Sequence, residues 1–439
     1  MADAATSTDD VVTLTSELIR IDTSNYGGGN CKERPAAEYV AARLDEAGVA
    51  ATLLESAPGR ANVVARVEGA DQSRAALLVH GHLDVVPAAA ADWSVHPFSG
   101  EVRDGVVWGR GAVDMKNMIA MMLAVARAWA RDGRRPSRDV VFAFTADEED
   151  NATAGAAWLV RNRPELFDSC TEGIGESGAY TFHAGGGVRL YPIGAGERGT
   201  AWLDLTAHGT AGHGSRVNRD NAVGALAAAV ARIDAYEWPA RLTPTVRAAF
   251  RAIGSALGQD LDPDAQDFDV DAALATLGAA RRLVESTVRN SANPTMLQAG
   301  YKVNVIPSLA TGRVDGRVLP GAEDEFAAAL DELTGPSVEW AYHHREVPLT
   351  APVDSPVFAA MAAAVRAEDP GAHVVPVCLA GGTDAKQFSR LGIVGYGFSP
   401  LKLPPGFDYY ALFHGVDERV PIDGLRFGVR VLDRFLTAP

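Results

Sequence analysis

Imidazole and carboxylate side chains directly follow several apolar segments, at the positions where β-strands would end. His82 follows an apolar run that begins at Ala75, and the pair Glu148–Glu149 follows a run that begins at Val140. In an open α/β sheet the carboxyl ends of the strands border the ligand crevice, so these side chains could converge there. A charged group at the end of an apolar strand is costly unless it is paired or bound to metal. Comparable positions are held by Asp114, Glu176 and, far downstream, His414.

This donor set indicates a metal site. Imidazole and carboxylate ligands without thiolates suit Zn²⁺, Mn²⁺ or Co²⁺. Taken singly, His82 could be a hydrogen-bonded turn histidine, and Asp114 could serve a helix dipole. Their joint placement favours the metal site. Asp84 lies two residues after His82 on the same side of an extended chain, where it could accept a hydrogen bond from the imidazole.

The segments that must carry these residues alternate between strand and helix patterns. Ala75–His80 and Val140–Thr145 are typical of buried strands, whereas Met115–Ala130 has its apolar residues on one helical face. This order predicts a mainly parallel sheet covered by helices. Strands are also expected at Val374–Leu379 and Ile393–Phe398, and helices at Val11–Ile21, Ala36–Ala47 and Ile422–Phe435.

The middle of the chain predicts a second, compact α+β module that interrupts the first. Its expected strands are Ala201–Ala207, Lys302–Ile306, Arg313–Leu319 and Val338–His343, and its expected helices are Ala222–Ile233 and Phe326–Leu333. The segment from Phe250 to Arg289, rich in Ala, Asp and Gly, fits no predicted element.

Composition narrows the functional classes. The 439 residues carry a formal net charge of −16, which argues against a binder of nucleic acid or of anionic membranes. Three scattered cysteines, Cys31, Cys170 and Cys378, form no disulfide framework and suit a reducing compartment. Neither a signal peptide nor a membrane-spanning segment is recognisable, so a soluble cytoplasmic protein is expected.

Eight sequence blocks, in order, resemble the two-zinc exopeptidases and deacylases related to aminoacylase, acetylornithine deacetylase, succinyl-diaminopimelate desuccinylase and carboxypeptidase S. The later blocks are most similar to the carboxypeptidase-S-like branch. The blocks are LVHGHLDVVP at 78–87, GRGAVDMK at 109–116, TADEE at 145–149, GHGS at 212–215, VNVIP at 303–307, DGRVLPG at 315–321, GGTDA at 381–385 and FHGVDE at 413–418.

The resemblance implies a dinuclear site of two Zn²⁺ ions, with Co²⁺ or Mn²⁺ as alternatives. One metal would be bound by His82 and Glu176 and the other by Glu149 and His414, with Asp114 bridging both. Glu148 would be the general base that activates a water molecule held between the metals, and Asp84 would orient His82.

The resemblance also implies an α/β, doubly wound zinc-binding catalytic domain, residues 1–196 and 349–439, with an inserted α+β lid at 197–348 that mediates homodimerisation. His213 of the lid would stabilise the oxyanion, in dimers at the partner's site. Arg317 would bind the substrate carboxylate, although an ion pair with Asp315 is the rival interpretation. Positioning donors would be Asn304, Gly382 and Thr383.

The predicted function is therefore metal-dependent hydrolysis of the amide bond of a small peptide or an N-acyl amino acid, releasing an amino acid. An N-acyl-amino-acid deacylase or desuccinylase, rather than a dipeptidase or carboxypeptidase, stays open. So does a non-catalytic metal-binding homologue. A serine hydrolase would need a G-x-S-x-G elbow, which the sequence lacks.

Overall fold

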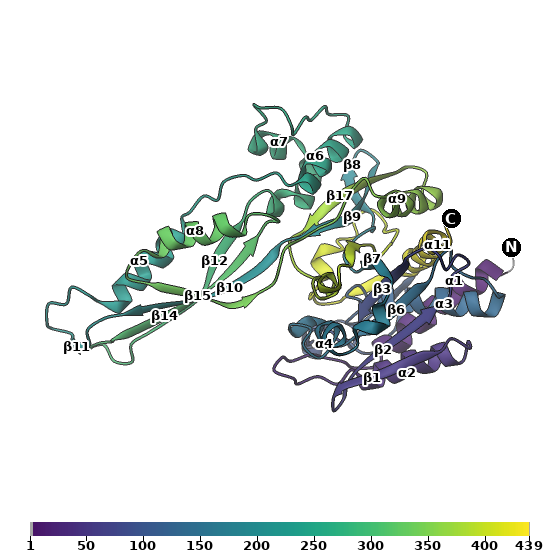
Figure 1. Cartoon of the computed structure of the whole chain (residues 1–439), viewed down its shortest axis with the longest axis horizontal. Coiled ribbons are helices and arrows are strands. Elements are labelled where there is room, and N and C mark those ends of the chain that lie inside the picture. The colour runs from purple at the N-terminus through teal and green to yellow at the C-terminus, as the bar shows by residue number, and fades with distance from the viewer. Residues whose placement is uncertain (1–2, 439) are drawn as a thin grey trace.

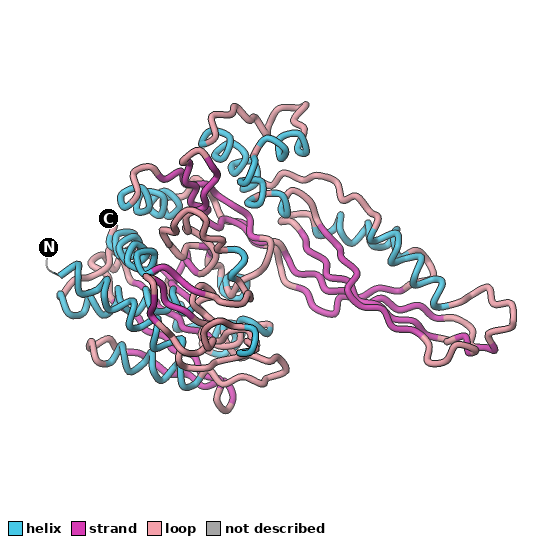
Figure 2. The backbone as a smooth tube through the Cα atoms, turned by 180° about the vertical axis from the view of Figure 1, so that it is seen from behind, coloured by secondary structure: helices cyan, strands magenta, loops and turns pink. Residues whose placement is uncertain are grey.

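The structure is a computed structural model that describes residues 3–438, and it has two parts of different shape (Figure 1). The first part, here called the body, is built on a ten-stranded sheet. The second, here called the arm, is built on a four-stranded sheet and projects away from the body in both views (Figures 1 and 2). Within the described residues, no helix is long and apolar enough to cross a membrane.

The centre of the body sheet is parallel. Strands β6, β3, β7 and β18 run parallel to one another, which confirms the predicted parallel arrangement for the middle of the sheet. The flanking pairs β2–β6 and β18–β9 are antiparallel, whereas β17 is parallel to β9. The order is β1 (Ala51–Ala57), β2 (Arg60–Val67), β6 (Val140–Thr145), β3 (Ala76–His82), β7 (Cys170–Gly175), β18 (Val394–Gly397), β9 (Val188–Glu197) and β16 (Leu349–Thr350), with β17 (Ala372–Leu379) and β8 (Phe182–Gly185) also paired to β9.

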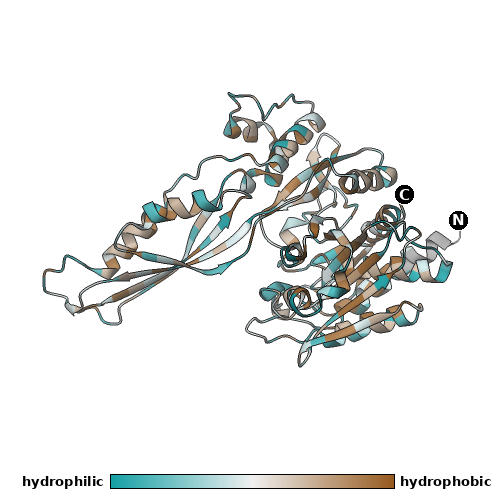
Figure 3. Cartoon of the chain, in the orientation of Figure 1, coloured by the Kyte–Doolittle hydropathy of each residue, from teal (hydrophilic) through white to brown (hydrophobic). Residues whose placement is uncertain are grey.

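Helices cover both faces of this sheet because successive strand residues point to opposite sides. In β3, Leu77 and Val79 pack in one apolar cluster, and Leu78 packs in another on the opposite face. The apolar strands therefore lie inside the body (Figure 3). One face carries α1 (Asp3–Ile19), α2 (Arg34–Asp45), α3 (Lys116–Asp132), α9 (Pro356–Glu368) and α11 (Ile422–Thr437), and the other carries α4 (Ala156–Asn162) and α10 (Ala385–Phe388).

The arm confirms the predicted α+β module, with two helices on an antiparallel sheet. Its strand order is β12 (Ser291–Ala299), β14 (Leu309–Val318), β10 (Gly199–His208) and β15 (Glu339–Arg345), and its helices are α5 (Ala222–Asp234) and α8 (Glu323–Thr334). Strand β12 was not predicted, because it contains Pro294 and mostly exposed residues that give no apolar alternation.

The expected strand Lys302–Ile306 is shorter than predicted. Only β13 (Val305–Ile306) is paired, with β11 (Gly212–His213), and this pair lies at the distal end of the arm (Figure 1). The residues before it form a turn, with Val303 fully exposed. The apolar residues of this segment have no buried face to pack against, so the strand is shorter than the sequence pattern predicts.

The segment that fits no predicted element folds as α6 (Pro244–Ala256), α7 (Val270–Thr276) and 3₁₀ turns at Gly278–Leu283 and Glu285–Thr287. Phe250 and Ile253 of α6 pack against Val375 and Val377 of β17, in the body sheet. This part of the predicted 197–348 insertion therefore lies on the body. The division at 197 and 348 stays a prediction.

A small three-stranded sheet joins two loops of the body. It consists of β4 (Val102–Arg103), β5 (Val106–Trp108) and β19 (Arg419–Pro421). Because β19 pairs with β5, the loop that precedes β19 is held beside the loop that follows β5. Those two loops carry His414 and Asp114.

Candidate metal centre

The chemistry-bearing residues lie at the ends of the central strands, where the sequence placed them. His82 is the last residue of β3, and Glu176 directly follows β7. Glu148 and Glu149 lie in a 3₁₀ turn that starts three residues after β6. Asp114 and His414 reach the same place from the loops described above.

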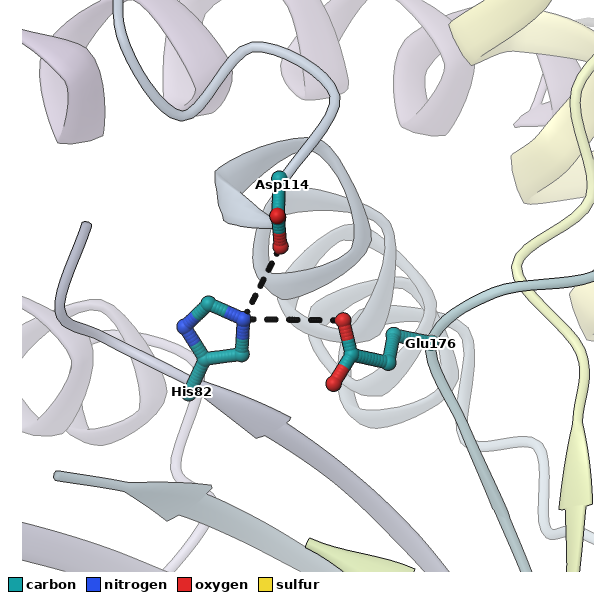
Figure 4. Close-up of side chains that lie close together, drawn as sticks. All are labelled: His82, Asp114 and Glu176. Carbon is teal, nitrogen blue, oxygen red and sulfur yellow. Dashed lines mark hydrogen bonds and ion pairs between the residues drawn. The ribbon is translucent and has the colours of Figure 1, made fainter. Parts of the chain in front are cut away.

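Two groups of these side chains gather closely enough to hold metal ions. In the first, His82 Nε2 lies 3.1 Å from Asp114 Oδ1 and 3.7 Å from Glu176 Oε2 (Figure 4). In the second, His414 Nε2 lies 3.3 Å from Asp114 Oδ2 and 3.2 Å from Glu149 Oε2. The two oxygens of Asp114 thus face different histidines, so this carboxylate connects both groups.

The donor set fits a pair of tetrahedral cations. Ligand atoms at 2.0–2.1 Å from a tetrahedral Zn²⁺ stand about 3.3 Å apart, which is close to the four separations above. Glu149 Oε1 is buried and has no hydrogen-bond partner among the described residues. Since a buried carboxylate oxygen is rarely left unpaired, this atom is available to a ligand that the protein itself does not supply.

The histidines and carboxylates of the two groups shift one another's pKa values toward their charged forms. Burial alone would lower the pKa of His82, but its hydrogen bonds with Asp114 and Glu176 hold that pKa well above its usual value. Hydrogen bonds with Asp114 and Glu149 raise the pKa of His414 to about 10. Burial opposes ionisation of Asp114, but both histidines keep its pKa below the usual range. Positive charge is therefore favoured between these carboxylates, and a bound cation would replace the protons.

Glu148 is partly buried beside this cluster. Burial and the neighbouring charge of Glu176 raise the pKa of Glu148 well above its usual value, and burial also raises the pKa of Glu176. Glu148 lines two clefts that meet at the cluster, together with Glu149 and His414. The residue predicted as the base is therefore placed where a substrate could reach it.

Asp84 supports the site differently from the prediction. The contact of His82 Nδ1 is with the Asp84 backbone carbonyl at 2.9 Å, whereas the Asp84 carboxylate is 3.7 Å away. That carboxylate instead accepts hydrogen bonds from the backbone N–H groups of Glu148 and Glu149, each at 3.1 Å. Asn25 donates a third hydrogen bond to it. The Asp84 side chain therefore holds the turn that carries the two glutamates.

Glu418 is the last residue of the FHGVDE block and has no predicted role, yet its side chain makes several contacts near the centre. Its buried carboxylate accepts hydrogen bonds from the backbone N–H groups of Gly111, Val113 and Asp114 at 3.0, 2.7 and 3.2 Å. Arg110 donates to the same carboxylate at 2.6 Å and to the His414 carbonyl at 3.3 Å. The Arg110–Glu418 pair therefore joins the loops of Asp114 and His414.

His414 itself has a left-handed backbone conformation, with φ of 55°. A non-glycine residue is uncommon there and persists when its surroundings hold it. Asp147, just before Glu148, is similar with φ of 66°. The Asp147 carboxylate is buried and accepts hydrogen bonds from Arg60 and Asn25. Both turns that carry site residues are thus fixed by buried polar contacts.

Three of the four predicted substrate-binding residues lie beside the centre. Arg317, Gly382 and Thr383 line one cleft with Glu148 and Glu149. Arg317 forms the two-pronged ion pair with Asp315 that was its rival interpretation, at 2.7 and 3.1 Å. Both donors of Thr383, its N–H and its hydroxyl, are directed to Glu197.

The other two predicted arm residues are not brought to the centre of their own chain. His213 and Asn304 lie together at the distal end of the arm, where the Gly214 N–H donates to the Asn304 carbonyl at 2.9 Å (Figure 1). His213 is exposed, and Ser215 Oγ is 2.8 Å from its Nδ1.

An α/β body with two groups of candidate metal ligands at its strand ends, joined to a separate arm, is an arrangement typical of metal-dependent hydrolases. The chain belongs to peptidase family M20/M25/M40, whose family model matches residues 78–438. This confirms the predicted family, the fold class and the identification as a metallohydrolase.

Relatives with assigned names are moderately similar over most of the chain. The N-fatty-acyl-amino acid synthase/hydrolase PM20D1 of Xenopus tropicalis is 28% identical over 386 residues, which cover 83% of this chain and 72% of the relative. Aminoacylase-1 of Sus scrofa is 26% identical over 438 residues, covering 97% and 94%.

Solved structures share the fold at lower identity. The M20 family metallo-carboxypeptidase Sso-CP2 from Sulfolobus solfataricus matches with a TM-score of 0.71 at 18% identity, covering 98% of this chain and 99% of that one. Human carnosine dipeptidase 1 matches with a TM-score of 0.68 at 15% identity, covering 99% and 96%.

Proposed function

We propose that this protein releases an amino acid from a small peptide or an N-acyl amino acid by metal-dependent hydrolysis of an amide bond. The observation that carries the proposal is the pair of ligand groups that share Asp114, with Glu148 beside them in an open cleft. The names of the relatives support the reaction class, since they include aminoacylase-1 and a probable carboxypeptidase S-like protein of Dictyostelium discoideum.

The residues have distinct roles in this proposal. His82 and Glu176 would bind one cation, Glu149 and His414 would bind the second, and Asp114 would be a ligand of both. Two cations bound there, Zn²⁺ or alternatively Co²⁺ or Mn²⁺, supply Lewis acidity that polarises a carbonyl and makes water more acidic. Glu148 accepts a proton from the attacking water and delivers it to the leaving amide nitrogen.

The cleft on the side of Arg317 suits the carboxylate of the released amino acid. This cleft of about 290 Å³ contains Arg317 and His344 from the arm and Gly382 and Thr383 from the body. Arg317 presents a planar two-pronged donor, and a substrate carboxylate would compete with Asp315 for it. Since Thr383 already donates to Glu197, its contribution is to shape the cleft.

We also propose a homodimer in which His213 and Asn304 act at the partner's centre. Strand β11, which contains His213, lies at the end of the arm away from the body (Figure 1), and Asn304 is beside it. Exposed apolar side chains surround them, with Val217, Tyr301 and Val303 at least 84% exposed. Clustered exposed apolar residues mark interaction surfaces. A cytoplasmic location is proposed as well, and it is supported by three cysteines that are all free and buried.

Removal of the metal tests the proposed function. The stripped protein should lose hydrolysis of amide substrates, and Zn²⁺, Co²⁺ or Mn²⁺ should restore it. At free metal of about 100 times Kd, binding should also add about 2.7 kcal/mol to the free energy of unfolding. Calorimetric unfolding and product release, followed in the same titration, provide the two readouts. Metal binding without hydrolysis of any peptide or N-acyl amino acid would instead support a non-catalytic homologue.

Glu418→Gln should weaken metal binding although Glu418 is not a ligand. The amide would place a donor against backbone N–H groups and Arg110, so the Asp114 loop would lose its support. We expect metal Kd, measured by competition with a chelator, to rise by about tenfold or more. Glu165→Gln, at an exposed glutamate paired with Arg163, is the matched control.

Arg110→Lys distinguishes positioning from a general loss of stability. Lysine keeps the charge near Glu418 but lacks the second branch that donates to the His414 carbonyl. Intermediate metal affinity is therefore expected. Wild-type affinity in both Glu418→Gln and Arg110→Lys would contradict the role of this pair.

A further inference from the structure

A second cleft, here called the apolar cleft, opens on the other side of the metal centre. It has a volume of about 390 Å³, within the range of small-molecule sites. It shares Glu148, Glu149, Gly382, Thr383 and His414 with the Arg317 cleft. The two clefts therefore meet at the reacting centre, and one extended substrate could occupy both.

Aromatic and aliphatic side chains line the apolar cleft beyond the metal centre, and all of them come from the body. The phenol of Tyr180 is hydrogen-bonded to that of Tyr410, and the ring of Tyr180 stacks on Tyr409 with centroids 4.4 Å apart. Tyr409 in turn packs against Phe413 in a T-shaped arrangement, with ring centroids 4.8 Å apart. These contacts fix the rings as one wall. The lining residues used below are Tyr180, Leu379, Ala380, Tyr410 and Phe413.

The charges in the apolar cleft limit what it can bind. Among the described residues that line it, the carboxylates are those of Asp114, Glu148, Glu149 and Glu176, which are the proposed metal ligands and base, and the one imidazole is that of His414. It contains no Lys or Arg among its described lining residues. Arg282 lies 5.2 Å from the Tyr410 ring centre but lines a neighbouring cleft, 3.7 Å from Asp408.

We infer that the apolar cleft takes a neutral, apolar acyl group, and that the preferred substrates are N-acyl amino acids rather than dipeptides or N-succinyl amino acids. This inference rests on the proposed function. A dipeptide would place a free ammonium in the cleft, where every acid is committed to the metals or the reaction. An N-succinyl group would place a second carboxylate there without a cation. Either charge would be desolvated without a partner, whereas an alkyl or aryl group gains from burial.

Five substrates that all release alanine test this inference on the metal-loaded protein: N-acetyl-, N-hexanoyl-, N-benzoyl- and N-succinyl-alanine, and Leu-Ala. N-hexanoyl-alanine should exceed N-succinyl-alanine and Leu-Ala in kcat/KM by about a hundredfold or more. It should exceed N-acetyl-alanine by about tenfold or more, because four further methylenes are buried. If Leu-Ala or N-succinyl-alanine is cleaved equally well, the inference is wrong while the proposed function stands. If no substrate is cleaved, both fail.

A pair of variants locates the selectivity in the cleft wall. Leu379→Asp supplies the missing counter-charge for an ammonium, and Leu379→Asn is the neutral variant of the same size. We expect kcat/KM for Leu-Ala to be about tenfold higher in the aspartate variant than in the asparagine variant, with both impaired for N-hexanoyl-alanine. Equal rates on Leu-Ala in the two variants would overturn the role of charge in this cleft.

Discussion

Glu148→Gln is expected to lower kcat by at least about a hundredfold, and up to about ten-thousandfold, without removing the metals. The amide keeps the shape of the side chain but cannot accept the proton of the attacking water. Its neighbour Glu149, rather than Glu148, belongs to a metal-ligand group. Steady-state kinetics on the best substrate, with metal content measured on the same sample, gives both readouts.

Glu149→Gln is the matched comparison, because Glu149 is the next residue in the chain but belongs to a candidate metal-ligand group. It should weaken binding of the metal shared by Asp114 and His414, and its activity should partly return at high metal concentration. Glu148→Gln should bind metal normally and should not be rescued. If Glu148→Gln retained wild-type kcat, another group would have to be the base.

The positions of the candidate ligands were predictable from local sequence patterns, whereas their roles were implied by the family resemblance. A polar residue directly after an apolar run, as with His82 and Glu176, is recognisable without knowledge of distant contacts. The parallel strand order then brings those positions to one edge of the sheet. This explains why the structure gathers His82, Asp114, Glu149, Glu176 and His414, which span more than three hundred residues of sequence.

The supporting contacts were not predictable in the same way. Glu418 accepts hydrogen bonds from residues more than 300 positions earlier in the chain, and no local pattern indicates such a partner. Asp84 was assigned to His82 from its spacing of two residues, yet its carboxylate holds the turn of Glu148 and Glu149. A buried carboxylate takes the nearest unpaired N–H donors, and these are set by the folded loops.

The charged residues that line the two clefts are more informative about the substrate than the net charge of the chain. The formal charge of −16 says little about the substrate, because the acids of the centre would be offset by two divalent cations. What would distinguish substrates is the charged group that each cleft can offer. On one side Arg317 could exchange its partner Asp315 for a substrate carboxylate. On the other side, the described residues that line the apolar cleft carry no charge besides the proposed metal ligands and base. If the inference is right, this asymmetry would orient an N-acyl amino acid and disfavour a zwitterionic dipeptide.

Two inactive variants should restore activity to each other if His213 acts across the subunit interface. His213→Ala alone should lose about a hundredfold or more in kcat, as expected for a donor to the oxyanion. Co-expression with Glu148→Gln under two affinity tags allows the heterodimer to be purified. In that heterodimer, the centre with intact Glu148 receives His213 from the other chain. About half of the wild-type activity per dimer should return, because one of two centres is complete.

Placing both substitutions on one chain reverses the expected outcome and so excludes simpler explanations. When Glu148→Gln/His213→Ala is paired with a wild-type chain, the wild-type centre has its base but lacks the histidine of its partner, so this heterodimer should be nearly inactive. If His213 acted within its own chain, the second heterodimer would be half active and the first would be inactive. The position of His213 at the distal end of the arm, away from its own centre (Figure 1), is the physical reason to expect the first pattern.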